Sequence, residues 1–174
     1  IQKADLNPDH LKSFLDCKSM EDIDKFTLCG DYGDTIYYPH LFRLIKMFRE
    51  KAFSISTNGS YKSKEWWTEL NRLLTDRDRI IFGIDGLGDQ NLKYRVNANW
   101  KSIETAVDVL SKGPAKLIVQ TLVFEFNYKT HIWAINIFFK PILNFFSYNR
   151  RCEWSKPLTM FYFFIYSIFH FRAS

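Results

Sequence analysis

Cysteine is scarce in this chain of 174 residues, and its spacing excludes the sites that cysteines usually build. The three cysteines are Cys17, Cys29 and Cys152, an odd number at wide intervals. Such a set predicts neither a disulfide framework nor a zinc site. We therefore expect a reducing, cytoplasmic setting.

The amino terminus lacks the features of a targeting segment. It reads Ile-Gln-Lys-Ala-Asp, without an initiator methionine, a basic region or the apolar run of a signal peptide. The missing methionine leads us to expect that the chain begins inside a longer reading frame.

Familiar catalytic motifs are lacking too. The chain has no glycine-rich P-loop and no G-x-S-x-G elbow, which argues against a P-loop nucleotide hydrolase and an α/β-hydrolase. Its four histidines are isolated from one another in the sequence. We found no internal repeat.

Acidic residues almost disappear after residue 127. From 128 to 174 the single acid is Glu153, and 14 of the 43 residues from 132 to 174 are aromatic. The aromatic-rich stretch 160–171 has 12 residues, whereas a membrane span needs roughly 20. Basic residues are scattered among the aromatics, so we expect no nucleic-acid partner and consider a membrane partner unfavoured. We interpret the range 128–174 as an aromatic-rich tail of doubtful origin. It is either the product of a shifted reading frame, a segment of a core or interface, or a membrane-associated segment.

Residues 1–127 show strands alternating with helices. Short apolar runs predict strands over 25–29, 53–57, 79–84 and 116–126. Helices are expected after the caps Asn7 and Ser63, from Pro39 onward, and around residues 103–110, with Gly113 ending the last of them. This order predicts an α/β fold with right-handed βαβ units and a parallel sheet, either in a (β/α) barrel or in a doubly wound sheet.

Polar and glycine residues follow each expected strand. In parallel α/β folds ligands bind at the carboxyl ends of the strands, so these residues are candidates for a site. They are, in chain order, Gly30, Asp31, Gly33, Asp34, Ser56, Thr57, Asn58, Asp85 and Asn127. The same residue types are also ordinary in turns between strands and helices. A metal- or ligand-binding, hydrolase-like domain that uses Asp31, Asp34 and Asp85 is one alternative, and an interaction module that docks through its tail is another.

The strand-end segments resemble the radical S-adenosylmethionine (radical SAM) family, in its SPASM and molybdenum-cofactor-type branch. The segment 26–34, Phe-Thr-Leu-Cys-Gly-Asp-Tyr-Gly-Asp, is similar to the glycine-acid motif after the family's second barrel strand. The segment 55–59, Ile-Ser-Thr-Asn-Gly, looks like its third-strand signature, and 84–86, Ile-Asp-Gly, looks like its fourth-strand segment. The stretch 94–100 is similar to the entry into the following helix. The resemblance covers about residues 6–127.

The resemblance implies a partial TIM-like barrel, here incomplete at both ends, with S-adenosylmethionine and a [4Fe–4S] cluster as cofactors of the intact parent. It places the cofactor's amino group at Gly30–Asp34, its carboxylate or ribose at Ser56, Thr57 and Asn58, and its ribose or adenine near Asn127. Asp85 belongs to the same binding set. The partners implied are an unknown peptide or small-molecule substrate and a reductant protein.

The sequence departs from the family in three places. The C-x3-C-x2-C motif that holds the cluster is missing, and thiolates are what such a cluster needs. Thr35 stands where the family usually has proline, and Gly83 stands where it often has serine. The match also ends after Asn127. We therefore expect an inactive fragment of a radical SAM enzyme, with no catalytic or metal-ligating residue of its own.

Overall fold

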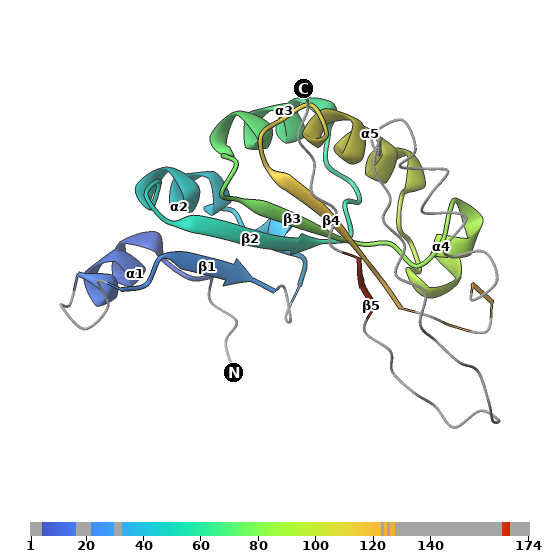
Figure 1. The fold of residues 1–174 in the computed structure, drawn as a ribbon, viewed down its shortest axis with the longest axis horizontal. Helices are drawn as coiled ribbons and strands as arrows, with labels where there is room; N and C mark the ends of the chain where they lie inside the picture. Colours follow the sequence, from blue (N-terminus) through green and yellow to red (C-terminus); the bar gives the residue numbers. More distant parts are fainter. Residues whose placement is uncertain are drawn as a thin grey trace.

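The computed structural model describes residues 5–16, 22–29, 33–122, 124, 126–127 and 165–167, and it alternates helices and strands (Figure 1). In chain order the elements are α1 Pro8–Leu15, β1 Lys25–Leu28, the 3-10 helix η2 Thr35–Tyr37, α2 Leu41–Met47, β2 Ala52–Thr57, α3 Lys64–Leu73, β3 Arg79–Gly83, α4 Asp89–Tyr94, α5 Trp100–Leu110, β4 Lys116–Thr121 and β5 Ile165–Ser167.

Strands β1 to β4 form a parallel sheet in which neighbours in space are also neighbours in sequence. The register pairs Ile55 with Ile80 and Ile80 with Leu117. Strand β5 adds to β4 in the antiparallel direction. The predicted α/β class and the parallel sheet are therefore confirmed.

Helices α2, α3 and α5 lie on one face of this sheet (Figure 1). Helix α3 packs against α2 on one side and against α5 on the other. Between helices and sheet lies a core whose side chains are almost fully buried, among them Trp67 and Leu70 of α3, Ile80 and Phe82 of β3, and Ile103 of α5. Burying a side chain of this size stabilises the fold by about 1.5–3 kcal/mol relative to leaving it exposed.

Side chains cap the N-termini of two of the helices that the sequence predicts, α1 and α3. The Asn7 Oδ1 atom accepts a hydrogen bond from the backbone N–H of Asp9 at 2.9 Å, at the start of α1. The Ser63 Oγ atom accepts one from the N–H of Trp66 at 3.3 Å, at the start of α3. These caps satisfy N–H groups that the first helical turn leaves without partners.

The ends of β1, β2 and β3 differ from the expectation by one residue each, and three differences are larger. Helix α2 begins at Leu41 rather than at Pro39, since residues 39–40 form a turn and His40 is the residue that precedes the helix. The short helix α4 was not expected. Strand β4 ends at Thr121 instead of Phe126, because the next N–H, that of Leu122, donates to the Asp85 carboxylate and leaves the ladder.

A buried carboxylate fixes the other end of β3. Asp78 is 1% exposed and accepts hydrogen bonds from the N–H of Phe53 at 2.7 Å and of Thr75 at 2.6 Å. It therefore ties the turn before β3 to strand β2. Sequence reasoning missed this residue, because an aspartate in a Thr-Asp-Arg-Asp turn is typical of a solvent-exposed loop.

No helix within the described residues is both long enough and apolar enough to cross a membrane. Apart from β5, the tail 128–174 lies outside the described residues. Its origin and the domain boundary at residue 127 stay predictions.

Candidate functional site at the carboxyl ends of the strands

The parallel strands bring the predicted site residues to one edge of the sheet, called the rim below. Gly33 and Asp34 follow β1, Ser56 and Thr57 end β2, and Asn58 comes next. Asp85 follows β3, and Asn127 lies six residues beyond the end of β4. Gly30 and Asp31 lie outside the described residues.

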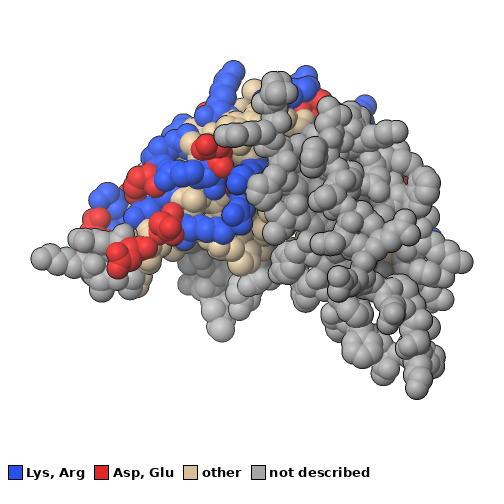
Figure 2. Space-filling view, in the orientation of Figure 1, with Lys and Arg blue, Asp and Glu red and all other residues tan. Residues whose placement is uncertain are grey.

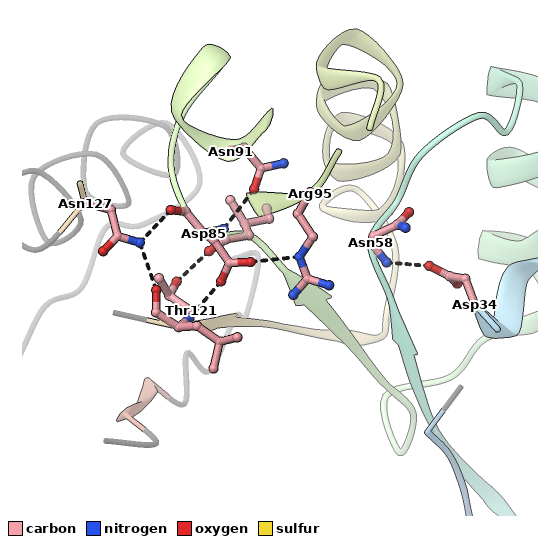
Figure 3. A network of polar contacts seen from close by, with 9 residues as sticks. Asp34, Asn58, Asp85, Asn91, Arg95, Thr121 and Asn127 are labelled. Carbon is pink, nitrogen blue, oxygen red and sulfur yellow. Dashed lines mark hydrogen bonds and ion pairs between the residues drawn. The ribbon is translucent and has the colours of Figure 1, made fainter. Parts of the chain in front are cut away.

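Asp34 links the rim of β1 to the rim of β2. Its Oδ2 atom accepts a hydrogen bond from the backbone N–H of Asn58 at 2.6 Å (Figure 3). Its Oδ1 atom accepts one from the N–H of Ile36 at 3.1 Å, which caps η2. The carboxylate therefore holds two loops together.

The turn after β2 is also tied by its own side chains. The Thr57 hydroxyl accepts a hydrogen bond from the N–H of Gly59 at 2.9 Å, and the Asn58 Oδ1 atom accepts one from the N–H of Ser60 at 2.9 Å. Gly59 has a φ of 73°, and a Cβ there would lie 2.9 Å from the Phe82 ring. The position thus requires glycine. The half-buried Ser56 precedes this turn.

Asp85 is the centre of a second group of contacts and is fully buried (Figure 3). Its Oδ2 atom forms an ion pair with Nε of Arg95 at 2.7 Å, and its Oδ1 atom accepts a hydrogen bond from the N–H of Leu122 at 2.7 Å. Its own N–H donates to the Asn91 Oδ1 atom at 2.8 Å. The negative charge is therefore paired, which a buried charge requires.

Asn127 folds back onto the same group. Its Nδ2 atom donates to the carbonyl oxygens of Asp85 at 2.7 Å and of Leu122 at 2.8 Å, and its Oδ1 atom accepts from the N–H of Phe124 at 2.7 Å. The Thr121 hydroxyl adds a hydrogen bond to the carbonyl of Ile84 at 2.7 Å. Asn127 thus closes the segment after β4 against the end of β3.

Sequence reasoning missed Asn91 and Arg95, the two side chains that complete the Asp85 group. Asn91 lies in the unexpected helix α4, and Arg95 directly follows that helix. In the sequence, Arg95 lies in the stretch 94–100, whose resemblance to the family predicts no role for this side chain. A signal existed, since a buried carboxylate after a strand needs a cation nearby.

A cavity of about 470 Å³ lies between the Asp34 group and the Asp85 group. Asn58 of the first group and Arg95 of the second both line it. Its remaining lining residues come from the end of η2, from the loop after β2, and from the end of α4 and the loop that follows it: Tyr37, Ser60, Tyr61, Tyr94, Val96, Asn97 and Ala98. The cavity is therefore where the two groups meet.

Tyr37, which lines this cavity, has a raised side-chain pKa. Burial raises the pKa of the Tyr37 hydroxyl above its ordinary value, and the charges of Asp34 and Tyr61 raise this pKa further. The hydroxyl donates to the carbonyl of Ser60 at 3.2 Å. Tyr37 is consequently a neutral donor at physiological pH.

Within the described residues, no three histidine, cysteine, aspartate or glutamate side chains converge as ligands for a metal ion. Cys29, the one cysteine in that part of the chain, is exposed and carries a free thiol. Asp34 and Asp85 belong to separate groups, each with its own partners (Figure 3).

Comparisons of the chain with protein-family models, with curated proteins and with solved structures found no match.

Proposed function

We propose that this chain is part of a radical SAM enzyme whose intact form reductively cleaves S-adenosylmethionine to start radical chemistry on a peptide or small molecule. One observation carries the proposal. The glycine-acid, Thr-Asn-Gly and Ile-Asp-Gly motifs follow three consecutive parallel strands, β1, β2 and β3, at the same edge of the sheet. That is the order in which the family uses them.

The topology supports a partial barrel. A doubly wound sheet reverses its strand order and places helices on both faces. Here β1 to β4 run in sequence order, and α2, α3 and α5 share one face (Figure 1). Barrels are built in that way, with helices on the outside.

The rim offers partial support for binding S-adenosylmethionine. The Asn58 side chain lines the cavity, and its Oδ1 atom is occupied by Ser60, which leaves the Nδ2 donor for a carboxylate or a ribose oxygen. Asp34 already accepts two backbone N–H groups, but each carboxylate oxygen has a further lone pair for an ammonium group. Asp85 and Asn127 would act indirectly, by holding Arg95 and the loop after β4.

The [4Fe–4S] cluster does not fit the residues of this chain, because the sequence has no C-x3-C-x2-C motif. No chemical step is therefore assigned to the cluster here. The proposal requires that the ligands come from sequence outside this chain and the electron from a reductant protein. It also implies a reducing compartment such as the cytoplasm, and it makes the chain inactive alone.

The hydrolase-like alternative has weaker support. It needs Asp31, Asp34 and Asp85 around one metal ion or one water molecule. The Asp85 carboxylate is instead fully buried and paired with Arg95, and the Asp34 carboxylate accepts hydrogen bonds from backbone N–H groups of the segments after β1 and β2.

The proposal is tested first on the gene. The DNA upstream of the Ile1 codon is expected to encode the three-cysteine motif in frame, and a start codon near Ile1 without that motif would contradict the proposal. The chain joined to that upstream segment is then reconstituted anaerobically with iron and sulfide. We expect the charge-transfer absorbance of a [4Fe–4S] cluster.

The amino-group site is tested in the same reconstituted protein. Asp34→Ala is expected to weaken S-adenosylmethionine binding about tenfold, equivalent to about 1.4 kcal/mol, as measured by equilibrium dialysis. Asp108→Ala, at an exposed carboxylate of α5 that pairs with Lys112, is the matched control and should leave the affinity unchanged. Equal affinities for both variants would exclude Asp34 from the site.

A further inference from the structure

The cavity between the two groups has an aromatic wall that is open to solvent. Tyr37, Tyr61 and Tyr94 all line it, and they are 51%, 58% and 46% exposed. Large apolar side chains that gather around a hollow mark a place where a ligand removes them from water. A flat ring has the shape that tyrosine rings pack against best.

The guanidinium of Arg95 lines the same cavity, and only one of its three nitrogens has an acceptor among the described residues. Arg95 donates from Nε to Asp85, and in the described part of the chain its Nη1 and Nη2 atoms donate to no protein acceptor. The Arg95 side chain is 31% exposed, whereas that of Asp85 is fully buried. The positive member of the pair therefore faces the cavity, and its two remaining nitrogens match the two oxygens of a carboxylate.

Asn58 lines the same cavity, and within the described residues its Nδ2 atom donates to no acceptor, since its turn uses only Oδ1. Lys62 does not line the cavity, but its Nζ atom lies 4.6 Å from the centre of the ring of Tyr37, which does. The cavity thus combines donors and positive charge with aromatic rings. Its volume of about 470 Å³ is within the usual range of pockets for small molecules.

Backbone conformation adds an independent observation. Tyr61 and Asn97 both have a φ of 64°, in the left-handed region, which asparagine adopts readily but a bulky residue such as tyrosine rarely does. The Tyr61 hydroxyl donates to the carbonyl of Asn97, so the two residues hold each other across the cavity wall. A left-handed residue costs roughly 1–2 kcal/mol, and such strain clusters at ligand sites. A glycine at position 61 would remove this cost but also the ring.

From this combination we propose that the cavity is a binding site for a small aromatic carboxylate, with the ring against Tyr61 and Tyr94 and the carboxylate on Arg95. The inference shares this cavity and Asn58 with the proposed S-adenosylmethionine site, but it does not rest on the radical SAM function. It concerns only residues of this chain, and it needs neither a cluster nor S-adenosylmethionine.

The test uses the full chain and phenylacetate as the probe, with binding measured by isothermal titration calorimetry. Two analogues separate the contributions. Cyclohexylacetate keeps the charge but lacks the flat ring, and 2-phenylacetamide keeps the ring but lacks the charge. We expect phenylacetate to bind with millimolar or better affinity, and each analogue to bind about tenfold more weakly, which corresponds to about 1.4 kcal/mol.

Variants locate the binding in the cavity. Tyr61→Leu removes an exposed ring, and Arg95→Lys keeps the charge beside Asp85 but removes the planar pair of donors. Each is expected to weaken phenylacetate binding at least about fivefold, equivalent to about 1 kcal/mol. Phe14→Leu is the matched control, because Phe14 is 59% exposed on α1, away from the cavity, and its loss should change nothing.

Tyr61→Leu keeps the test decisive if Arg95→Lys does not fold, which far-ultraviolet circular dichroism will reveal. Absence of phenylacetate binding would overturn the inference, as would equal affinity for the uncharged amide or unchanged binding in Tyr61→Leu. A failure to bind S-adenosylmethionine with phenylacetate binding intact would overturn the proposed function alone.

Discussion

The guanidinium of Arg95 occupies the space in which a side chain at position 83 would lie. A Cβ atom on Gly83 would be 2.7 Å from Nη2 of Arg95 and 3.2 Å from its Cζ atom. The guanidinium is held there from two sides, since Nε is paired with the buried Asp85 carboxylate and Cζ lies 5.4 Å from the centre of the Tyr94 ring. The glycine at the end of β3 is therefore part of the Asp85 group.

A side chain at position 83 should loosen this ion pair. Gly83→Ala forces the guanidinium to move, and the buried Asp85 then loses part of its compensation. We expect a decrease of about 1–3 kcal/mol in the free energy of unfolding, measured by urea denaturation with tryptophan fluorescence.

The control is a double-mutant cycle with Arg95→Ala. That variant alone is expected to cost about 3–5 kcal/mol, because it leaves a buried charge unpaired. In its background Gly83→Ala meets no guanidinium, so it should cost little, and the reduced freedom of the unfolded chain even favours alanine. Equal costs in both backgrounds would show that Arg95 is not what makes glycine necessary.

Asn127 allows a second test of the Asp85 group, because its side-chain amide both donates and accepts hydrogen bonds. Asn127→Asp replaces the Nδ2 donor with an oxygen that faces the carbonyls of Asp85 and Leu122. We expect a loss of about 2–4 kcal/mol in unfolding free energy, because the two hydrogen bonds of Nδ2 are lost and a buried charge is left unpaired.

The same substitution at Asn99 is its matched control. The Asn99 Oδ1 atom accepts from the N–H of Ser102 at 3.0 Å as the cap of α5, and an aspartate there keeps that acceptor near a favourable helix end. Its effect should stay within about 0.5 kcal/mol. Similar losses at both positions would argue against the closing role of Asn127.

The sequence was sufficient for the fold where local patterns determine structure. Apolar runs such as 80–82 are long enough to identify strands, and Asn7 and Ser63 are recognisable as caps because their hydrogen bonds reach only two or three residues along the chain. The predicted end of β4 is wrong because a contact distant in the sequence determines it. The residues up to Phe126 suit a strand, but the Asp85 carboxylate, 37 positions earlier, captures the N–H of Leu122.

The site was predictable as a set of positions but not as a set of contacts. Parallel strands necessarily bring Asp34, Asn58 and Asp85 to one edge. Their division into two groups depends on Arg95, which reaches Asp85 over ten positions and needs the space at Gly83. No periodic pattern encodes that relationship, and so the cavity between the groups emerged only from the structure.

Tyr37 provides a test of the cavity's electrostatics. Burial, the Asp34 carboxylate and Tyr61 all raise the pKa of its hydroxyl above the ordinary 10.0. The folded state therefore favours the protonated form, and this contribution to stability is fully present below pH 10 and is lost as the pH rises through the folded pKa. The difference between the tyrosinate absorbance of the wild type and that of Tyr37→Phe isolates the titration of Tyr37. We expect its midpoint above 10, and Asp34→Asn should move this midpoint downward by removing a negative charge. A midpoint at or below 10 in the wild type, or an upward movement in Asp34→Asn, would contradict the arrangement of these residues.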